Sequence, residues 1–129
     1  MQGKHDWDGA IADYTKAIEL KPDDGNAYHC RGDAKYGKND LESAIADYTK
    51  AIELAPDDQG AYHRRGDAEQ RKNDWDGAIA DYNKAIELKS DDAGAYFNRS
   101  LAKKAKGDLA GASADYHKAI ELQPDLENH

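Results

Sequence analysis

The sequence contains no valine, and Thr15 and Thr49 are its only threonines. β-branched residues other than isoleucine are therefore scarce, whereas Ala, Leu, Lys, Glu and Asp dominate, and this composition favours helices over sheets. The single cysteine, Cys30, excludes a disulfide within the chain. The sequence also lacks an apolar run that could form the core of a signal peptide or cross a membrane. We therefore expect an all-α protein of the cytoplasm, with no membrane partner.

An excess of positive charge is missing as well, because the formal net charge is -8. Nucleic-acid backbones and anionic membrane surfaces are bound by clustered Lys and Arg, so neither is expected to be the main partner. Hydrophobic residues make up 39% of the chain and charged residues 34%, a balance that is polar but still compatible with folding. The 129 residues are enough for one compact domain or one short repeat array.

One eleven-residue segment, AIADYTKAIEL, is present at residues 10–20 and again at 44–54. Near copies, AIADYNKAIEL and ASADYHKAIEL, occupy residues 78–88 and 112–122, so that every copy begins 34 residues after the one before it. Within 44–54 five apolar residues fall at i, i+1, i+4, i+7 and i+8, which places them on one face of an α-helix: Ala44, Ile45, Tyr48, Ala51 and Ile52. Each copy is therefore predicted to be an amphipathic helix.

A second pattern lies between these copies and also predicts helices. The segments NAYHCRGDAKYG, GAYHRRGDAEQR and GAYFNRSLAKKA each follow a PDD or SDD turn. Proline cannot continue a helix, so Pro22, Pro56 and Pro124 mark helix ends. The predicted helices are 7–20, 26–37, 41–54, 60–71, 75–88, 94–105 and 109–122. The aspartates expected to cap them are Asp6, Asp24, Asp40, Asp58, Asp74, Asp92 and Asp108.

The chain resembles the tetratricopeptide repeat (TPR) family, whose unit is a 34-residue helix-turn-helix. Several columns agree in register: the first-helix aromatic and glycine, the small residue that opens the second helix, a central tyrosine, a later alanine and a terminal proline. These columns hold Tyr28, Gly32, Tyr62 and Gly66; Ala44, Ala78 and Ala112; Tyr48, Tyr82 and Tyr116; Ala51, Ala85 and Ala119; and Pro56 and Pro124. Because its 34-residue repeats are nearly identical, the chain resembles a bacterial-type array of this family.

The resemblance implies an all-α fold, a right-handed α-solenoid of about seven helices in a single array over residues 1–129. We expect a leading half-repeat at 1–24, which holds only a second helix, complete repeats at 25–58, 59–92 and 93–126, and no capping helix. The expected stub of a first helix lies at residues 1–6. Two explanations of these ends remain open: the chain is a piece of a longer array, or the exposed ends pair between copies.

Two departures from the family pattern involve charge and helix packing. Arg31, Arg65 and Arg99 occupy a first-helix column that is often leucine in the family, and Ser90 and Ser100 replace a proline and a glycine of the other copies. We hypothesise that the arginines pair with the equally regular Asp47, Asp81 and Asp115 in a ladder of charge-assisted hydrogen bonds. The alternative is that the arginines lie along the surface by their aliphatic stems.

The family resemblance also implies a function, because the concave wall of such a solenoid, formed by the first helices, usually binds a peptide or a partner helix. We therefore expect a scaffold for protein–protein interaction. The alternative is a self-assembly unit that forms homo-oligomers through its uncapped terminal helices. The residues expected to face the peptide are His29, Asp33, Tyr36, His63, Arg64, Asp67, Gln70, Phe97, Asn98, Leu101 and Lys104. Acidic and imidazole groups gather at one end of this set, and apolar and basic groups at the other.

One branch of the family clamps the terminal carboxylates of chaperone tails, but the matching columns here do not hold that set of residues. They hold His29 and Asp33, then Arg64, then Gly94 and Asn98. Because an aspartate would repel a terminal carboxylate, that specificity is not expected.

The sequence predicts no enzyme, metal or cofactor. His29 and His63 are one repeat apart, too far from each other for the three or four convergent ligands that a metal needs, and paired aspartates at turns are explained as helix caps. Cys30 has no recognisable base with an orienting partner, and no glycine-rich phosphate loop is present.

Overall fold

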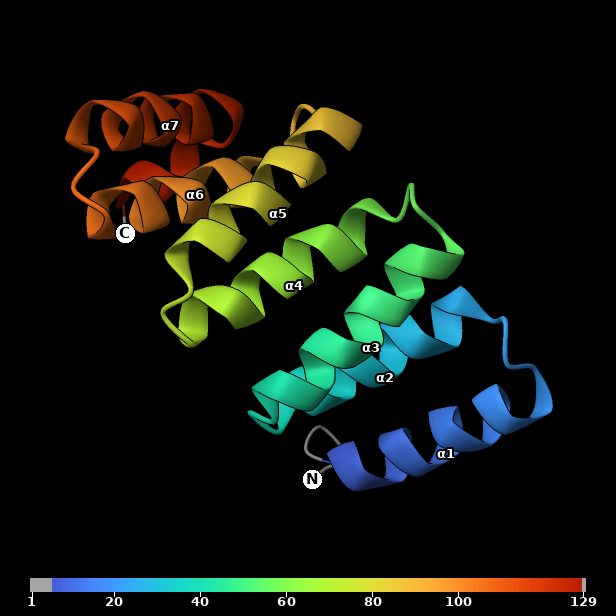
Figure 1. Ribbon diagram of the computed structural model, residues 1–129. Coiled ribbons are helices and arrows are strands. Elements are labelled where there is room, and N and C mark those ends of the chain that lie inside the picture. Colours follow the sequence, from blue (N-terminus) through green and yellow to red (C-terminus); the bar gives the residue numbers. More distant parts are fainter. Residues whose placement is uncertain (1–5, 129) are drawn as a thin grey trace.

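The computed structural model describes residues 6–128, and this part of the chain is helical without any strand. The helices follow one another in an antiparallel succession from α1 at one end of the array to α7 at the other (Figure 1). The bounds are α1 (Trp7–Leu20), α2 (Gly25–Gly37), α3 (Leu41–Leu54), α4 (Gln59–Arg71), α5 (Trp75–Leu88), α6 (Ala93–Ala105), α7 (Leu109–Leu122) and the 3-10 helix η2 (Pro124–Asn128).

The predicted helix bounds agree closely with the structure. The four second helices of the units (α1, α3, α5 and α7) begin and end at the predicted residues. The three first helices begin one residue earlier than predicted, at Gly25, Gln59 and Ala93, directly after the aspartates that cap them. Residues 1–5 of the expected first-helix stub lie outside the described residues.

Six of the seven predicted capping aspartates accept a hydrogen bond from a backbone N–H three residues on, but Asp40 does not. In the other second helices the third helical residue is glycine, and a Cβ on Gly77 would lie 2.5 Å from the Asp74 carboxylate. Ser43 occupies this position in α3, so its side chain fills the space that the carboxylate would need. The first helices tolerate alanine there because their cap residues are more extended, with ψ of 91° at Asp24 against 76° at Asp40.

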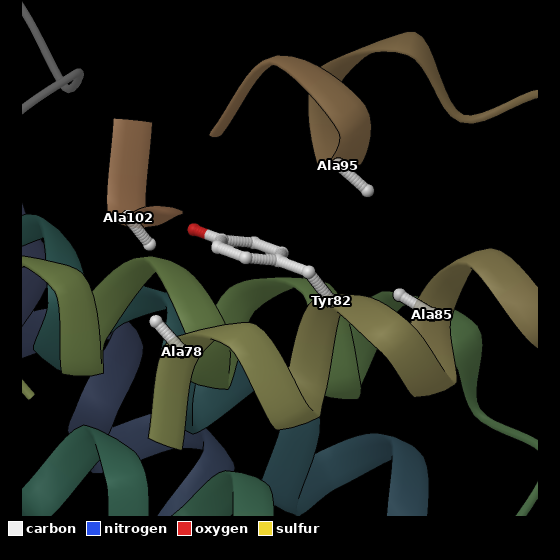
Figure 2. Close-up of a cluster of buried hydrophobic side chains, with 5 residues drawn as sticks. All are labelled: Ala78, Tyr82, Ala85, Ala95 and Ala102. Carbon is white, nitrogen blue, oxygen red and sulfur yellow. The ribbon is translucent and has the colours of Figure 1, made fainter. Parts of the chain in front are cut away.

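The core is built from tyrosines that lie between alanines and glycines. Tyr48 and Tyr82 are fully buried, and a Cβ on Gly32 or Gly66 would approach their rings to 2.9 Å. Around Tyr82 lie Ala78 and Ala85 from its own helix α5, and Ala95 and Ala102 from α6 of the next unit (Figure 2). The Tyr82 ring lies at the interface between two consecutive units, and the small residues around it allow these units to approach each other closely.

The predicted arginine–aspartate ladder is confirmed. Arg65 donates two hydrogen bonds to Asp81, from Nε at 2.8 Å and from Nη2 at 2.7 Å, so the carboxylate is held bidentately. Its Nη1 donates to Thr49 Oγ1 at 3.1 Å in the preceding unit. The same fork is repeated for Arg31 with Asp47 and Thr15, and for Arg99 with Asp115 and Asn83. The alternative, in which the arginines lie along the surface, is therefore wrong, and each arginine joins three consecutive helices.

The middle unit, formed by α4 and α5, differs from the other two in the residue that lies next to the arginine–aspartate pair. Lys35 and Lys103 add a second cation to Asp47 and Asp115, each at 2.9 Å, whereas Glu69 stands at the equivalent position beside Asp81. Burial, the hydrogen bond to Asp81 and the charge of Asp81 raise the pKa of Glu69 to about 9. Its Oε1 is buried without a hydrogen-bond partner. The second unit therefore holds two adjacent carboxyl groups where its neighbours hold a lysine–carboxylate pair.

Replacing Arg65 with leucine should destabilise the array by about 3–5 kcal/mol, because the buried Asp81 carboxylate would lose its partner. The measurement is urea unfolding followed by circular dichroism. Arg64→Leu is the matched control, since Arg64 is half exposed and its loss should change the unfolding free energy by less than about 0.5 kcal/mol. Removing both charges, as in Arg65→Leu with Asp81→Leu, should recover much of the loss. Equal melting of Arg65→Leu and wild type would contradict a structural role for the ladder.

The stability should fall as the pH rises from about 4.5 to about 9, because Glu69 keeps its proton in the folded state over this range and loses it in the unfolded state. Below the lower value both states are protonated, so this contribution is then fully present. Between pH 5 and pH 9 the Glu69→Gln variant should lose at least about 1 kcal/mol less unfolding free energy than the wild type does. Glu87→Gln, on the exposed surface of α5, is the control. Parallel stability curves for wild type and Glu69→Gln would contradict the raised pKa.

Candidate functional site

The eleven residues predicted to face a peptide all lie on α2, α4 and α6, the first helices of the three units. They line three hollows, with volumes of about 280, 250 and 430 Å³. We name them the imidazole hollow (His29, Asp33, Gly60, His63, Arg64), the amide hollow (Tyr36, Asp67, Gln70, Arg71, Tyr82, Asn98) and the apolar groove (Phe97, Ser100, Leu101, Lys104, Leu109, Ala112, Ser113, Tyr116, Leu126). The predicted set is therefore divided among three sites along the first helices.

In the imidazole hollow each histidine joins two units. His63 lies 2.6 Å from Asp92 through Nδ1 and 3.6 Å from Asp67 through Nε2. Asp92 also caps α6, so the imidazole of one unit is fixed to the first turn of the next. His29 repeats this arrangement, with its Nδ1 2.8 Å from Asp58. The sequence pattern did not predict this structural role, although the spacing of 29 residues between the partners is present twice in the sequence.

The charges around His63 change its protonation. Burial alone would lower the pKa of His63, but the hydrogen bond to Asp92 and the charges of Asp67 and Asp92 outweigh burial and raise it. Burial alone would raise the pKa of Asp92. The hydrogen bond and charge of His63 outweigh burial, together with the hydrogen bonds from Ala95 and Gln59, and lower the pKa of Asp92 to about 2. Both shifts favour a charged imidazolium–carboxylate pair at the junction between α4 and α6.

In the amide hollow the central carboxylate is already engaged. Asp67 accepts hydrogen bonds from the Tyr82 hydroxyl at 2.6 Å and from Asn98 Nδ2 at 3.2 Å, and it pairs with Arg64 at 3.3 Å. Gln70 Nε2 donates to the Asn98 carbonyl at 3.1 Å, while Gln70 Oε1 is buried without a partner. The polar groups at the centre of this hollow are therefore largely engaged within the protein or buried.

An aromatic residue closes one side of the amide hollow. The guanidinium of Arg71 lies 4.3 Å from the centre of the Tyr36 ring, and that of Arg64 lies 5.9 Å from it. Both cations are within the distance at which a ring face attracts positive charge. Tyr36 thus holds two arginines at the boundary between the imidazole and amide hollows.

The apolar groove lies between α6, α7 and η2. Three of its large apolar side chains are exposed: Leu101 at 44%, Leu109 at 65% and Tyr116 at 36%. Leu126 closes one wall from η2, a helix that no sequence pattern predicts. Of the groove residues, only Phe97, Leu101 and Lys104 had been predicted to form the site.

Within residues 6–128 no group of three or more His, Cys, Asp or Glu side chains is arranged to hold a metal ion. None of the helices in this part of the chain is both long and apolar enough to cross a membrane.

Comparison with known proteins identifies the family. The family model described as "TPR repeat" matches residues 4–39, 32–72 and 66–104, and the model described as "Tetratricopeptide repeat" matches residues 93–126. The helices α1 to α7 thus form an α-solenoid of helix-turn-helix units, and the chain belongs to the tetratricopeptide repeat family. No curated protein matches it in sequence.

Several solved structures are similar in fold. The MamA protein shares 27% identity with a TM-score of 0.85, over 95% of this chain and 67% of that chain. The Arabidopsis OM64 TPR domain shares 26% identity with a TM-score of 0.77, over 78% of this chain and 84% of that chain. The first TPR of Spaghetti (RPAP3), bound to the HSP90 peptide SRMEEVD, shares 27% identity with a TM-score of 0.76, over 78% and 79%.

Proposed function

We propose that this protein is a non-catalytic scaffold that binds an extended peptide, or a segment of a protein partner, along the face of its first helices. The observation that carries the proposal is the set of three hollows, which lie along α2, α4 and α6 and are lined by all eleven predicted residues. Tetratricopeptide repeat proteins generally serve protein–protein interaction, and one similar structure, the first TPR of Spaghetti, is bound to a peptide.

The charges along this face limit the kind of peptide that it favours. The imidazole hollow contains Asp33, and the amide hollow contains Asp67. Both carboxylates would repel a terminal carboxylate, and Arg64, which lines the imidazole hollow, already pairs with Asp67. We therefore propose that the partner is not a chaperone tail, and that its segment places polar groups over the first two hollows and apolar groups over the third.

A second candidate function, self-association, is favoured by the open face of α1. Asp13 is exposed, whereas Asp47, Asp81 and Asp115 at the equivalent positions are buried against arginine. Leu20 is 77% exposed, against 36% for Leu54 at the same position in α3. The face of α1 is therefore able to receive another helix, and a second copy of this chain is one source of such a helix.

Peptides selected from a displayed random library of segments of about 12 residues test the first proposal. The double variant Arg64→Ala with Phe97→Ala should weaken capture of the selected peptides by at least about tenfold, because it removes contacts in two different hollows. Lys50→Ala with Lys84→Ala is the matched control, since both lysines lie exposed on the second helices α3 and α5. Fluorescence anisotropy measures the affinity. Undiminished capture by the Arg64 and Phe97 variant would contradict binding on this face.

Light scattering after size-exclusion chromatography, over about a hundredfold range of concentration, tests self-association. A mass that rises above 14.2 kDa with concentration is the expected result if the face of α1 binds a second copy. The Leu20→Glu variant should then restore the monomer, because the added charge would have to be buried in the contact. A constant monomer mass at all concentrations would argue against this second function.

A further inference from the structure

The third unit departs from the second at several of the positions that define its binding face. Positions 34 residues apart are equivalent in this array, so Phe97 stands where the second unit has His63, and Leu101 stands where it has Asp67. Leu126 likewise occupies the position of Asp92. All three changes replace a polar or charged side chain with an apolar one, and the three residues come from two different helices, α6 and η2.

These changes remove a complete polar network. In the second unit His63 pairs with Asp92 at 2.6 Å, and the Tyr82 hydroxyl donates to Asp67 at 2.6 Å. No carboxylate stands at either equivalent position of the third unit. Instead the Phe97 and Tyr116 rings pack with their centres 6.2 Å apart, and Phe97, Leu101 and Leu126 line one groove. In the second unit α6 of the next unit also covers Tyr82 through Ala95 and Ala102, whereas within residues 6–128 no first helix of a following unit packs over α7. The apolar substitutions and this uncovered face together leave an open apolar surface at the third unit.

One lysine, Lys104, lies on this groove. Lys104 lines it and occupies the position that is Gln70 in the second unit. Its neighbours Lys103 and Lys106 are engaged, with Asp115 and with Asp76. Within the described residues Lys104 forms no ion pair, so its ammonium group remains available to an anion brought by a ligand.

We propose that the apolar groove binds an aliphatic or aromatic side chain of a peptide, and that an aspartate or glutamate next to that side chain in the peptide pairs with Lys104. The inference rests on the proposed function, because it takes the first-helix face to bind peptides, and it defines which residues the peptide must carry at the third unit. Charge complementarity decides the occupant: the groove offers apolar contact and one free positive charge, and a peptide with an acidic residue beside an apolar one satisfies both.

The internal repeats supply variants that should fold. Leu101→Asp and Lys104→Gln each introduce the residue that the second unit carries at that position, and Leu101 is exposed rather than part of the core. Leu101→Asp also places a carboxylate where Asp67 accepts from the tyrosine hydroxyl. Leu101→Ser serves as a second variant, since it removes the apolar contact without adding charge. Melting temperatures establish that each variant is folded before binding is measured.

The test uses displayed random peptides of about 12 residues, selected on the wild-type protein and resynthesised with amidated C-termini, so that only side-chain carboxylates remain. Selected peptides should share an aliphatic or aromatic residue within two positions of Asp or Glu. Leu101→Asp should weaken binding by at least about tenfold, and Lys104→Gln by about three- to tenfold. Changing the acidic residue of the peptide to its amide should weaken binding to the wild type, but not to Lys104→Gln.

The outcomes separate this inference from the proposed function. Peptides whose affinity falls with Arg64→Ala but is unchanged by Leu101→Asp, Leu101→Ser and Lys104→Gln would leave peptide binding on this face in place and overturn the groove assignment. Affinity that is unchanged in all these variants would overturn both. Self-association of the wild-type protein that Leu101→Asp abolishes would assign the groove to a second copy, and would also overturn the inference.

Discussion

The buried fork between each first-helix arginine and the aspartate of its own second helix is the interaction on which the array depends. The carboxylates of Asp47, Asp81 and Asp115 are removed from water and have bidentate guanidinium partners. A guanidinium has five N–H groups in a fixed plane, so a third donor remains for the preceding unit, where Thr15, Thr49 or Asn83 accepts it. One side chain therefore fixes the register within a unit and the position of that unit against the previous one.

The binding face follows from that geometry. Once the first helices are fixed at a regular spacing, each histidine can reach the capping aspartate of the next first helix, so Asp58 and Asp92 serve as cap and as partner at once. Residues that the sequence assigns to ligand binding are then engaged in joining the units. His29, His63 and Asp67 have structural partners within the array. Leu101 and Lys104, in contrast, remain exposed to solvent. The specificity that we propose therefore depends mainly on the third unit.

The periodic features could be predicted from the sequence, and the local exceptions could not. A strict repeat of 34 residues defines the helices, the arginine column and the side of the array that the first helices form, since each rests on many equivalent positions. The missing cap at Asp40 depends on one neighbour, Ser43, and the raised pKa of Glu69 depends on the orientation of Asp81 across the unit. Helix η2 has no periodic pattern, so Leu126 could be assigned to the groove only when its place in the fold was known.

The places where the copies differ show how the array can combine stability with specificity. Glu69 leaves a buried oxygen without a partner, and the third unit exposes Leu101 where the other units have aspartate, so both departures from the repeated pattern are unfavourable for folding. In a solenoid each unit is stabilised mainly by its own two helices and by its nearest neighbours, which allows one unit to be weakened without loss of the others. The regular forks hold the array together, and a single unit is then free to replace hydrogen bonds of its own with an apolar surface that a partner can cover.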